Sequence, residues 1–197
     1  MLILSGGCDR KYPEYWRRLS EVITRETEAP HILSCLFSQE PEMRAEKHLA
    51  FDDYFRKAFG SDIEITHANE EEFYSQIDLA NVIYLHGGRT DRLMGAISDV
   101  EKFKSLIRGK IVVGSSAGAN FLTQVCYSPS KQSTIAGSGI LPVGVVVHYG
   151  IEAFEDTNYT HEFWRQAVSQ VRQELGAHAP LILLPEGQFV VIDDENY

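Results

Sequence analysis

The residues Gly114-Ser115-Ser116-Ala117-Gly118 place a candidate nucleophile among the small neighbours that a tight turn needs. They follow the branched apolar run 110–113 and precede residues 117–125, whose pattern is helical. A serine in the pattern G-x-S-x-G between a strand and a helix is typical of a hydrolase nucleophile elbow. The alternative is a plain strand-to-helix turn or a phosphate loop. The segment lacks the lysine of a P-loop and the glycine spacing of a dinucleotide site, so we favour the nucleophile.

The steric demands of the elbow distinguish between the two serines. The residues two before and two after the nucleophile approach each other closely, so both must be small. Gly114 and Gly118 meet this demand around Ser116, whereas centring the elbow on Ser115 would put the larger Val113 there. We therefore predict that Ser116 is the nucleophile.

An acyl-transfer site also needs donors for the developing oxyanion. The backbone N–H of Ala117, at the predicted start of the helix, is the natural first donor. Gly87 and Gly88 end another predicted strand, and their missing side chains allow the close backbone approach that a second donor requires.

A serine nucleophile needs a base, which in turn needs an orienting group. His31 and His48 fit poorly as the base, because His31 opens a predicted strand and His48 lies within a predicted helix. Three, His67, His86 and His148, lie near the carboxyl ends of predicted strands. His148 is the strongest of these because its strand, 144–149, comes after the nucleophile helix. The seven candidates are His31, His48, His67, His86, His148, His161 and His178.

The position of the acidic residues restricts the order of a triad. Residues 117–147 contain no Asp or Glu, so the order Ser-acid-His cannot use His148. Either His161 or His178 is the base, or the order is Ser-His-acid. Glu186, at the end of the predicted strand 180–187, would supply the acid in the second case. The residues alone leave both orders open.

The elements that must position these side chains alternate between apolar strands and amphipathic helices, which predicts an α/β fold with a mostly parallel sheet and helices on both faces. We expect one domain over residues 1–197, with the site at the carboxyl ends of the strands. Thr90 is a candidate N-cap, and residues 128–139 are expected to form a loop. The predicted strands are 2–6, 31–37, 62–68, 81–88, 110–114, 144–149, 180–187 and 188–193, and the helices 14–28, 41–60, 90–109, 117–125 and 160–175.

The composition excludes several classes of protein. The chain has 197 residues, 44% hydrophobic and 23% charged, as in ordinary globular domains. Its net charge of −10 argues against a nucleic-acid partner. No apolar run approaches the roughly 18 residues of a membrane span, and the start lacks a signal-peptide pattern, so we expect a cytoplasmic protein. Cys8, Cys35 and Cys126 are odd in number and widely spaced, which argues against a disulfide framework or zinc site.

Four segments together resemble the dipeptidase E and cyanophycinase family of serine peptidases. They are "YLHGGRTDRL", "GSSAGAN", the strand ending in "HY" and "LPEG", and their order matches across most of the chain. The resemblance implies a flavodoxin-like three-layer α/β/α fold, related to class I glutamine amidotransferases, that needs no metal or cofactor. It also implies a small peptide substrate, and a homodimer is one expected assembly.

Carried over to this sequence, the family pattern implies a Ser-His-Glu triad of Ser116, His148 and Glu186. Gly88 and Ala117 would supply the oxyanion N–H groups. Relatives often have Asn or Asp where this chain has Arg89. Arg89 could bind a substrate carboxylate, although a solvated surface arginine is the more ordinary interpretation.

We therefore expect a serine peptidase that hydrolyses small peptides through an acyl-enzyme. The alternatives are an esterase or amidase with the same triad, and a non-catalytic binding protein that keeps the elbow as a turn.

Overall fold

The computed structural model describes residues 1–7, 11–154, 157–176 and 178–193. Its larger sheet has six strands in the order β12-β1-β5-β4-β2-β3, all parallel to their neighbours except β12, which runs antiparallel to β1. The strands are β1 (Leu2–Ser5), β2 (His31–Cys35), β3 (Glu64–His67), β4 (Val82–Leu85), β5 (Ile111–Ser115) and β12 (Phe189–Ile192). The predicted mostly parallel sheet is confirmed.

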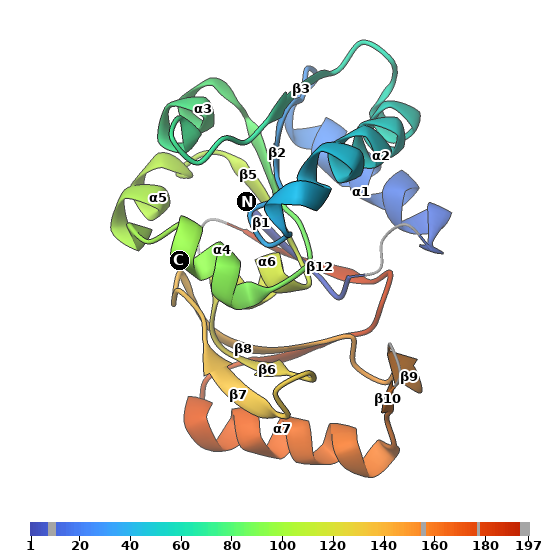
Figure 1. Cartoon of the computed structure of the whole chain (residues 1–197), viewed down its shortest axis with the longest axis vertical. Helices are drawn as coiled ribbons and strands as arrows, with labels where there is room; N and C mark the ends of the chain where they lie inside the picture. Colours follow the sequence, from blue (N-terminus) through green and yellow to red (C-terminus); the bar gives the residue numbers. More distant parts are fainter. Residues whose placement is uncertain (8–10, 155–156, 177, 194–197) are drawn as a thin grey trace.

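Helices cover both faces of this sheet because its central strands alternate apolar side chains between two cores (Figure 1). In β1, Ile3 packs in the cluster that contains Trp16 and Phe55, whereas Leu4 packs in the cluster that contains Phe103. The first face is covered by α1 (Pro13–Glu26) and α2 (Pro41–Phe59). The second is covered by α3 (Phe73–Leu79), α4 (Thr90–Ala96), α5 (Val100–Leu106) and α6 (Ala117–Leu122). These layers are the predicted three-layer α/β/α fold.

A second, four-stranded sheet of order β11-β8-β6-β7 lies beneath the first in Figure 1. Its strands are β6 (Thr123–Ser128), β7 (Ser133–Ala136), β8 (Leu141–Val147) and β11 (Leu181–Leu184). Helix α7 (His161–Leu175) packs on one face, while Val145 and Val147 join the core of the larger sheet. A short hairpin is formed by β9 (Ala153–Phe154) and β10 (Thr157–Asn158). One core cluster therefore spans both large sheets, and the single domain over 1–197 stays a prediction.

The second sheet accounts for two differences from the sequence-based expectations. The predicted helix 117–125 ends at Leu122, and the predicted loop 128–139 contains β7. The chain turns into a strand at Thr123 because β6 is paired on both sides, with β8 and with β7. This long-range pairing overrides the local helical pattern.

The predicted helix 90–109 is two helices, α4 and α5. Asp99 caps the second helix by accepting a hydrogen bond from the Lys102 N–H at 3.0 Å, which fixes a new helix start inside the expected one. Thr90 is not the N-cap, because Arg89 occupies that position. The Thr90 hydroxyl instead accepts a hydrogen bond from the buried Asn120 amide at 3.2 Å.

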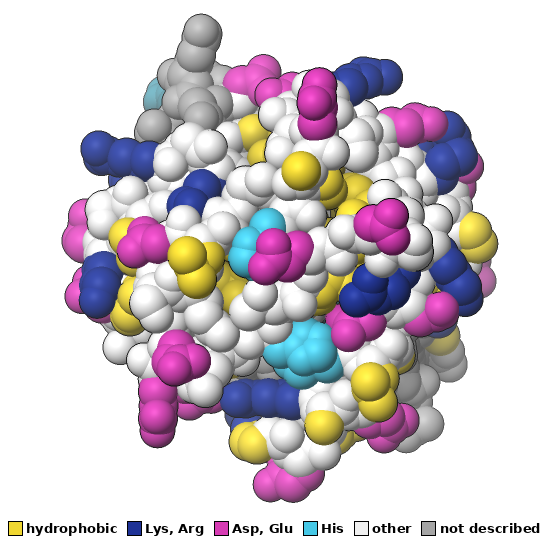
Figure 2. Space-filling view, turned by 90° about the horizontal axis from the view of Figure 1, so that it is seen from above, with side chains coloured by type: hydrophobic (Ala, Val, Ile, Leu, Met, Phe, Trp, Pro, Cys, Tyr) yellow, Lys and Arg dark blue, Asp and Glu magenta, His cyan; other side chains and the backbone are white. Residues whose placement is uncertain are grey.

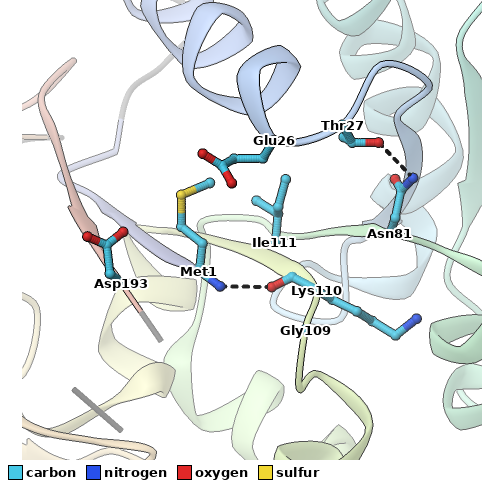
Figure 3. Close-up of a pocket in the computed structure, with 8 residues that line it drawn as sticks. All are labelled: Met1, Glu26, Thr27, Asn81, Gly109, Lys110, Ile111 and Asp193. Atoms are coloured by element: carbon cyan, nitrogen blue, oxygen red, sulfur yellow. Dashed lines mark hydrogen bonds between the residues drawn. The ribbon is translucent and has the colours of Figure 1, made fainter. Parts of the chain in front are cut away.

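A cavity of about 380 Å³ lies at the amino-terminal ends of the parallel strands (Figure 3). It is bordered by Met1, Asn81 and Ile111, which precede or begin β1, β4 and β5, and the Met1 ammonium donates to the Lys110 carbonyl at 3.1 Å. Ser116 follows the opposite end of β5, so this cavity is not part of the predicted site. None of the helices in the described part of the chain has the length and hydrophobicity that crossing a bilayer requires.

Candidate active site

Ser116 lies at the turn between β5 and α6 in a strained backbone conformation. Its φ of 49° and ψ of −103° fall outside the regions that non-glycine residues normally occupy. The conformation is held from both sides, because the Ser116 N–H donates to the Ser5 carbonyl at 3.0 Å and its carbonyl accepts from the Asn120 N–H at 2.9 Å. This is the local geometry of a nucleophile elbow.

Two glycines make the elbow sterically feasible. A Cβ added to Gly114 would lie 2.6 Å from the backbone of Gly118, and one added to Gly118 would lie 2.3 Å from the carbonyl oxygen of Leu85. Neither position therefore has room for a side chain. This supports the argument from sequence that assigned the elbow to Ser116 instead of Ser115, which lies buried within β5.

The structure brings Ser116, His148 and Glu186 together although they are widely separated in the sequence. The Oγ of Ser116 lies 2.8 Å from Nε2 of His148, and Nδ1 of His148 lies 2.9 Å from Oε1 of Glu186. Both distances are those of hydrogen bonds. The His148 and Glu186 side chains are only 10% and 7% exposed, so little water competes for their contact.

The pairing of β8 with β11 explains how the histidine meets the glutamate. Val147 and Leu184, the last residues of these parallel strands, are register partners. His148 follows directly and Glu186 follows two residues after Leu184, so both leave the second sheet at the same edge. His148 and Glu186 therefore come from a different sheet than Ser116.

Backbone contacts at the carboxyl end of β1 join the two sheets next to the site. The His148 N–H donates to the Gly6 carbonyl at 3.2 Å, and the Gly187 N–H donates to the Gly7 carbonyl at 3.0 Å. A Cβ on Gly7 would lie 2.7 Å from Cε1 of His148 and 2.9 Å from Cβ of Ser116. The predicted site did not include this glycine pair, although "LILSGG" has the same strand-then-Gly-Gly pattern as "YLHGG".

The second glycine pair, Gly87-Gly88, borders the serine hydroxyl. A Cβ on Gly87 would lie 3.2 Å from Cβ and 3.7 Å from Oγ of Ser116. Ala117 is buried directly beside Ser116 and begins α6. Among the described residues, neither the Gly88 N–H nor the Ala117 N–H donates a hydrogen bond. Ala117 thus lies next to Ser116, and Gly88 follows a glycine that borders it.

A comparison with protein-family models finds that residues 43–197 match the model of peptidase family S51. The chain belongs to peptidase family S51. Since the match covers most of the chain and includes the whole segment from the elbow onward, membership makes this protein a serine-type peptidase.

Two solved structures have the same fold as this S51 peptidase. A peptidase from an acI-B1 actinobacterium has a TM-score of 0.60 and 20% identity, over 94% of this chain and 80% of that one. A putative peptidase E protein from Listeria monocytogenes EGD-e has a TM-score of 0.62 and 14% identity, over 98% of this chain and 94% of that one. No curated protein gives a significant match to the sequence.

Other histidines of the S51 peptidase contact groups away from the serine. His31 lies 2.8 Å from the Thr66 hydroxyl, and His67 lies 3.0 Å from a carboxylate oxygen of Asp52. His86 follows β4 and contacts the Ser34 hydroxyl at 2.9 Å. Figure 2 shows histidine side chains among carboxylates on the face above β3. The ring that reaches the Ser116 hydroxyl is that of His148.

Arg89, the other predicted site residue of the S51 peptidase, binds a neighbouring carboxylate. Its Nε and Nη2 donate to the two oxygens of Asp91 at 3.1 and 2.7 Å, and its side chain is 60% exposed. The hydrogen bond and charge of Arg89 lower the pKa of Asp91 to about 2. A substrate carboxylate would have to compete with Asp91 for the Nε and Nη2 donors or use the other N–H groups of this guanidinium.

The two cysteine thiols in the described part of the S51 peptidase are buried. Cys35 and Cys126 are free thiols, and burial raises the pKa of each to about 12. Cys8 lies outside the described residues. Within the described ranges, no three His, Cys, Asp or Glu side chains are grouped so that they could hold a metal ion.

Proposed function

We propose that this S51 peptidase hydrolyses small peptides through an acyl-enzyme formed on Ser116. The observation that carries the proposal is the continuous contact from the Ser116 hydroxyl through the His148 ring to the Glu186 carboxylate. In this assignment Ser116 is the nucleophile, His148 is the base, and Glu186 orients the imidazole and stabilises its protonated form.

The first half of the reaction is acylation. His148 Nε2 accepts the hydroxyl proton as Ser116 Oγ bonds to the scissile carbonyl carbon, whose π electrons move onto oxygen. The tetrahedral oxyanion accepts hydrogen bonds from the N–H groups of Gly88 and Ala117. The oxyanion then collapses, the C–N bond breaks, and the protonated His148 delivers its proton to the leaving amine.

The second half repeats these steps with water. His148 accepts a proton from water as the water oxygen attacks the acyl carbon of the ester. Collapse of the second tetrahedral intermediate returns the proton to Ser116 and releases the carboxylic acid product. The same contact between His148 and Glu186 acts in both halves of the reaction. The two side chains are nearly buried, and their contact needs no rearrangement between steps.

The proposal also includes the substrate class and the partners of the protein. A preference for small peptides comes from the family resemblance, and Arg89 is a candidate for binding a substrate carboxylate in exchange for Asp91. The cytoplasmic location, the homodimer and the lack of a nucleic-acid or membrane partner also stay predictions.

Turnover of a dipeptide panel by the wild type, Ser116→Ala and Ser115→Ala tests the proposal. We expect Ser116→Ala to lose turnover by about 10⁶-fold and Ser115→Ala to retain it. A serine-reactive fluorophosphonate should label the wild type at Ser116. Unchanged turnover in Ser116→Ala would reject the assignment. Hydrolysis of esters without turnover of any peptide would indicate an esterase, and a wild type that is neither labelled nor active would indicate a binding protein.

A further inference from the structure

We infer that Gln39 is a positioning residue for the oxyanion site: its amide, held by Lys47, orients the Gly87–Gly88 peptide so that the Gly88 N–H faces the reacting carbonyl. The inference rests on the proposed function, because it concerns the donor that stabilises the tetrahedral intermediate. Gln39 lies in the segment between β2 and α2, far from Ser116 in the sequence.

The Gly87 carbonyl is held by two side chains of this segment. The Ser38 hydroxyl lies 2.8 Å from the Gly87 oxygen, and Nε2 of Gln39 donates to the same oxygen. Ser38 is almost fully buried and its hydroxyl also lies 2.9 Å from the His86 carbonyl, so it has one proton for two acceptors. The Gln39 amide is therefore the donor that Gly87 does not share.

The orientation of the Gln39 amide is itself determined by a charge. Lys47 Nζ, on α2, donates to Oε1 of Gln39. Since an ammonium group only donates, it selects the carbonyl end of the amide and leaves the NH₂ end facing Gly87. The donors and acceptors are therefore consistent in one arrangement only: Lys47 donates to the Gln39 carbonyl, and the Gln39 NH₂ donates to the Gly87 carbonyl.

Holding the Gly87 carbonyl also directs the next N–H. In a planar trans peptide the C=O of Gly87 and the N–H of Gly88 point in opposite directions. With the oxygen turned toward Ser38 and Gln39, the Gly88 N–H points away from that segment. A Cβ on Gly87 would lie 3.7 Å from Ser116 Oγ, so the Gly87–Gly88 peptide borders the hydroxyl and its N–H is the donor available to an oxyanion there.

Backbone hydrogen bonds flank the Gly87–Gly88 peptide and join it to the segment that contains Ser38 and Gln39. The Arg89 N–H donates to the Ser38 carbonyl at 2.8 Å, and the His86 N–H donates to the Cys35 carbonyl at 3.1 Å. Gly88 has a φ of 145°, and a Cβ there would lie 2.5 Å from the Ser38 oxygen. These contacts hold the segment that contains Gln39 beside the Gly87–Gly88 peptide. The Gln39 side chain therefore stays within reach of the Gly87 oxygen, and a change at Gln39 alters the contact that orients the peptide.

Three variants distinguish an effect of Gln39 on the orientation of the Gly87–Gly88 peptide from an effect of its side chain on packing. Gln39→Glu keeps the length of the side chain and the contact with Lys47 but puts an acceptor against the Gly87 oxygen. Gln39→Met has similar length and neither donates nor accepts. Gln170→Glu makes the same change of charge on an exposed position of α7 and serves as the control.

The measurement is kcat and KM for the best dipeptide of the panel. The concentration of active sites is determined by titration to completion with the fluorophosphonate, and kcat is calculated per titrated site. We expect kcat to fall in the order wild type, Gln39→Met, Gln39→Glu, with the last lower by about 10- to 100-fold, somewhat less than removal of an oxyanion donor itself. KM should change by less than about twofold, because the donor acts mainly on the tetrahedral species. Gln170→Glu should match the wild type.

The other outcomes have distinct meanings. Equal kcat per titrated site in the wild type and Gln39→Glu would overturn this inference and leave the triad standing. A lower fraction of titratable sites at unchanged kcat would show that Gln39 supports folding only, which also overturns it. A wild type without labelling or turnover would reject the proposed function, and the inference with it.

Discussion

Nδ1 of His148 lies 2.9 Å from Oε1 of Glu186, between side chains that are 10% and 7% exposed. A contact of this kind fixes which ring nitrogen carries a proton, because a carboxylate accepts and does not donate. Nε2 is then left as the acceptor that faces the Ser116 hydroxyl at 2.8 Å. The tautomer of His148 is thus determined by its contact with Glu186.

Glu186→Gln should separate the effect of Glu186 on the His148 tautomer from the role of the histidine itself. The amide keeps the shape of the side chain but can donate to Nδ1 and so stabilise the wrong tautomer. We expect kcat to fall by about 10³- to 10⁴-fold, as for the corresponding change in other triads. Steady-state kinetics on the best dipeptide measure the loss.

Glu152→Gln is the matched control, since it makes the same chemical change on an exposed side chain after β8. It should leave kcat unchanged. A decrease of less than tenfold in Glu186→Gln would argue against Glu186 as the orienting residue.

The elbow should tolerate no side chain at position 118. Gly118→Ala would put a Cβ 2.3 Å from the Leu85 carbonyl oxygen, which belongs to the backbone and cannot rotate away. We expect a loss of about 3 kcal/mol or more in the free energy of unfolding, at the upper end of overpacking effects. Urea denaturation followed by circular dichroism measures it.

Gly95→Ala is the comparison for that experiment. Gly95 lies in α4, and a Cβ there meets no atom within 4 Å. Alanine should therefore stabilise the protein by about 0.5–1 kcal/mol through helix propensity. Equal effects of the two substitutions would contradict the steric account of the elbow.

His48 should make stability depend on pH. Burial, followed by the charge of His67, lowers its pKa from 6.5 to about 4. The unfolded chain then binds more protons between these values, so the contribution of His48 is complete above about pH 6.5 and is lost as the pH falls through 4. The contribution is of order 3 kcal/mol.

Urea denaturation at pH 7 and pH 4.5 checks this dependence. His48→Leu should lose less stability over this interval than the wild type does. His178→Leu, at an exposed position, should behave like the wild type. If His48→Leu showed the full wild-type loss of stability, His48 would not be the source.

The two buried cysteines should be unreactive in the folded protein. Burial raises the pKa of Cys35 and Cys126 to about 12, so almost no thiolate exists at pH 8, and alkylation requires the thiolate. Iodoacetamide followed by peptide mass spectrometry should find both modified only after unfolding. Modification of either thiol in the native protein, at the rate seen in urea, would contradict this.

Much of the architecture follows from local sequence patterns. The branched apolar runs are strands, the amphipathic segments between them are helices, and β-α-β repetition requires a parallel sheet. The elbow could also be located, because the steric demand on Gly114 and Gly118 is local to the turn. The absence of acidic residues in 117–147 reduced the candidate triads to a few.

The second sheet could not be predicted in this way. Residues 123–125 continue the predicted helix 117–125 in the sequence, and Thr123–Ser128 becomes β6 only because β8 and β7 pair with it. Likewise, 90–109 appears as one helix, and the Asp99 cap that divides it depends on backbone geometry.

The sequence by itself predicted Ser116 as the nucleophile and predicted the types of residue that could serve it. Only the tertiary structure decided that His148, and not another histidine, reaches Ser116, and that Gln39 contacts Gly87. The physical reason is that these contacts depend on strand register and on the packing of two sheets, to which residues far apart in the chain contribute. Local propensity carries no information on either.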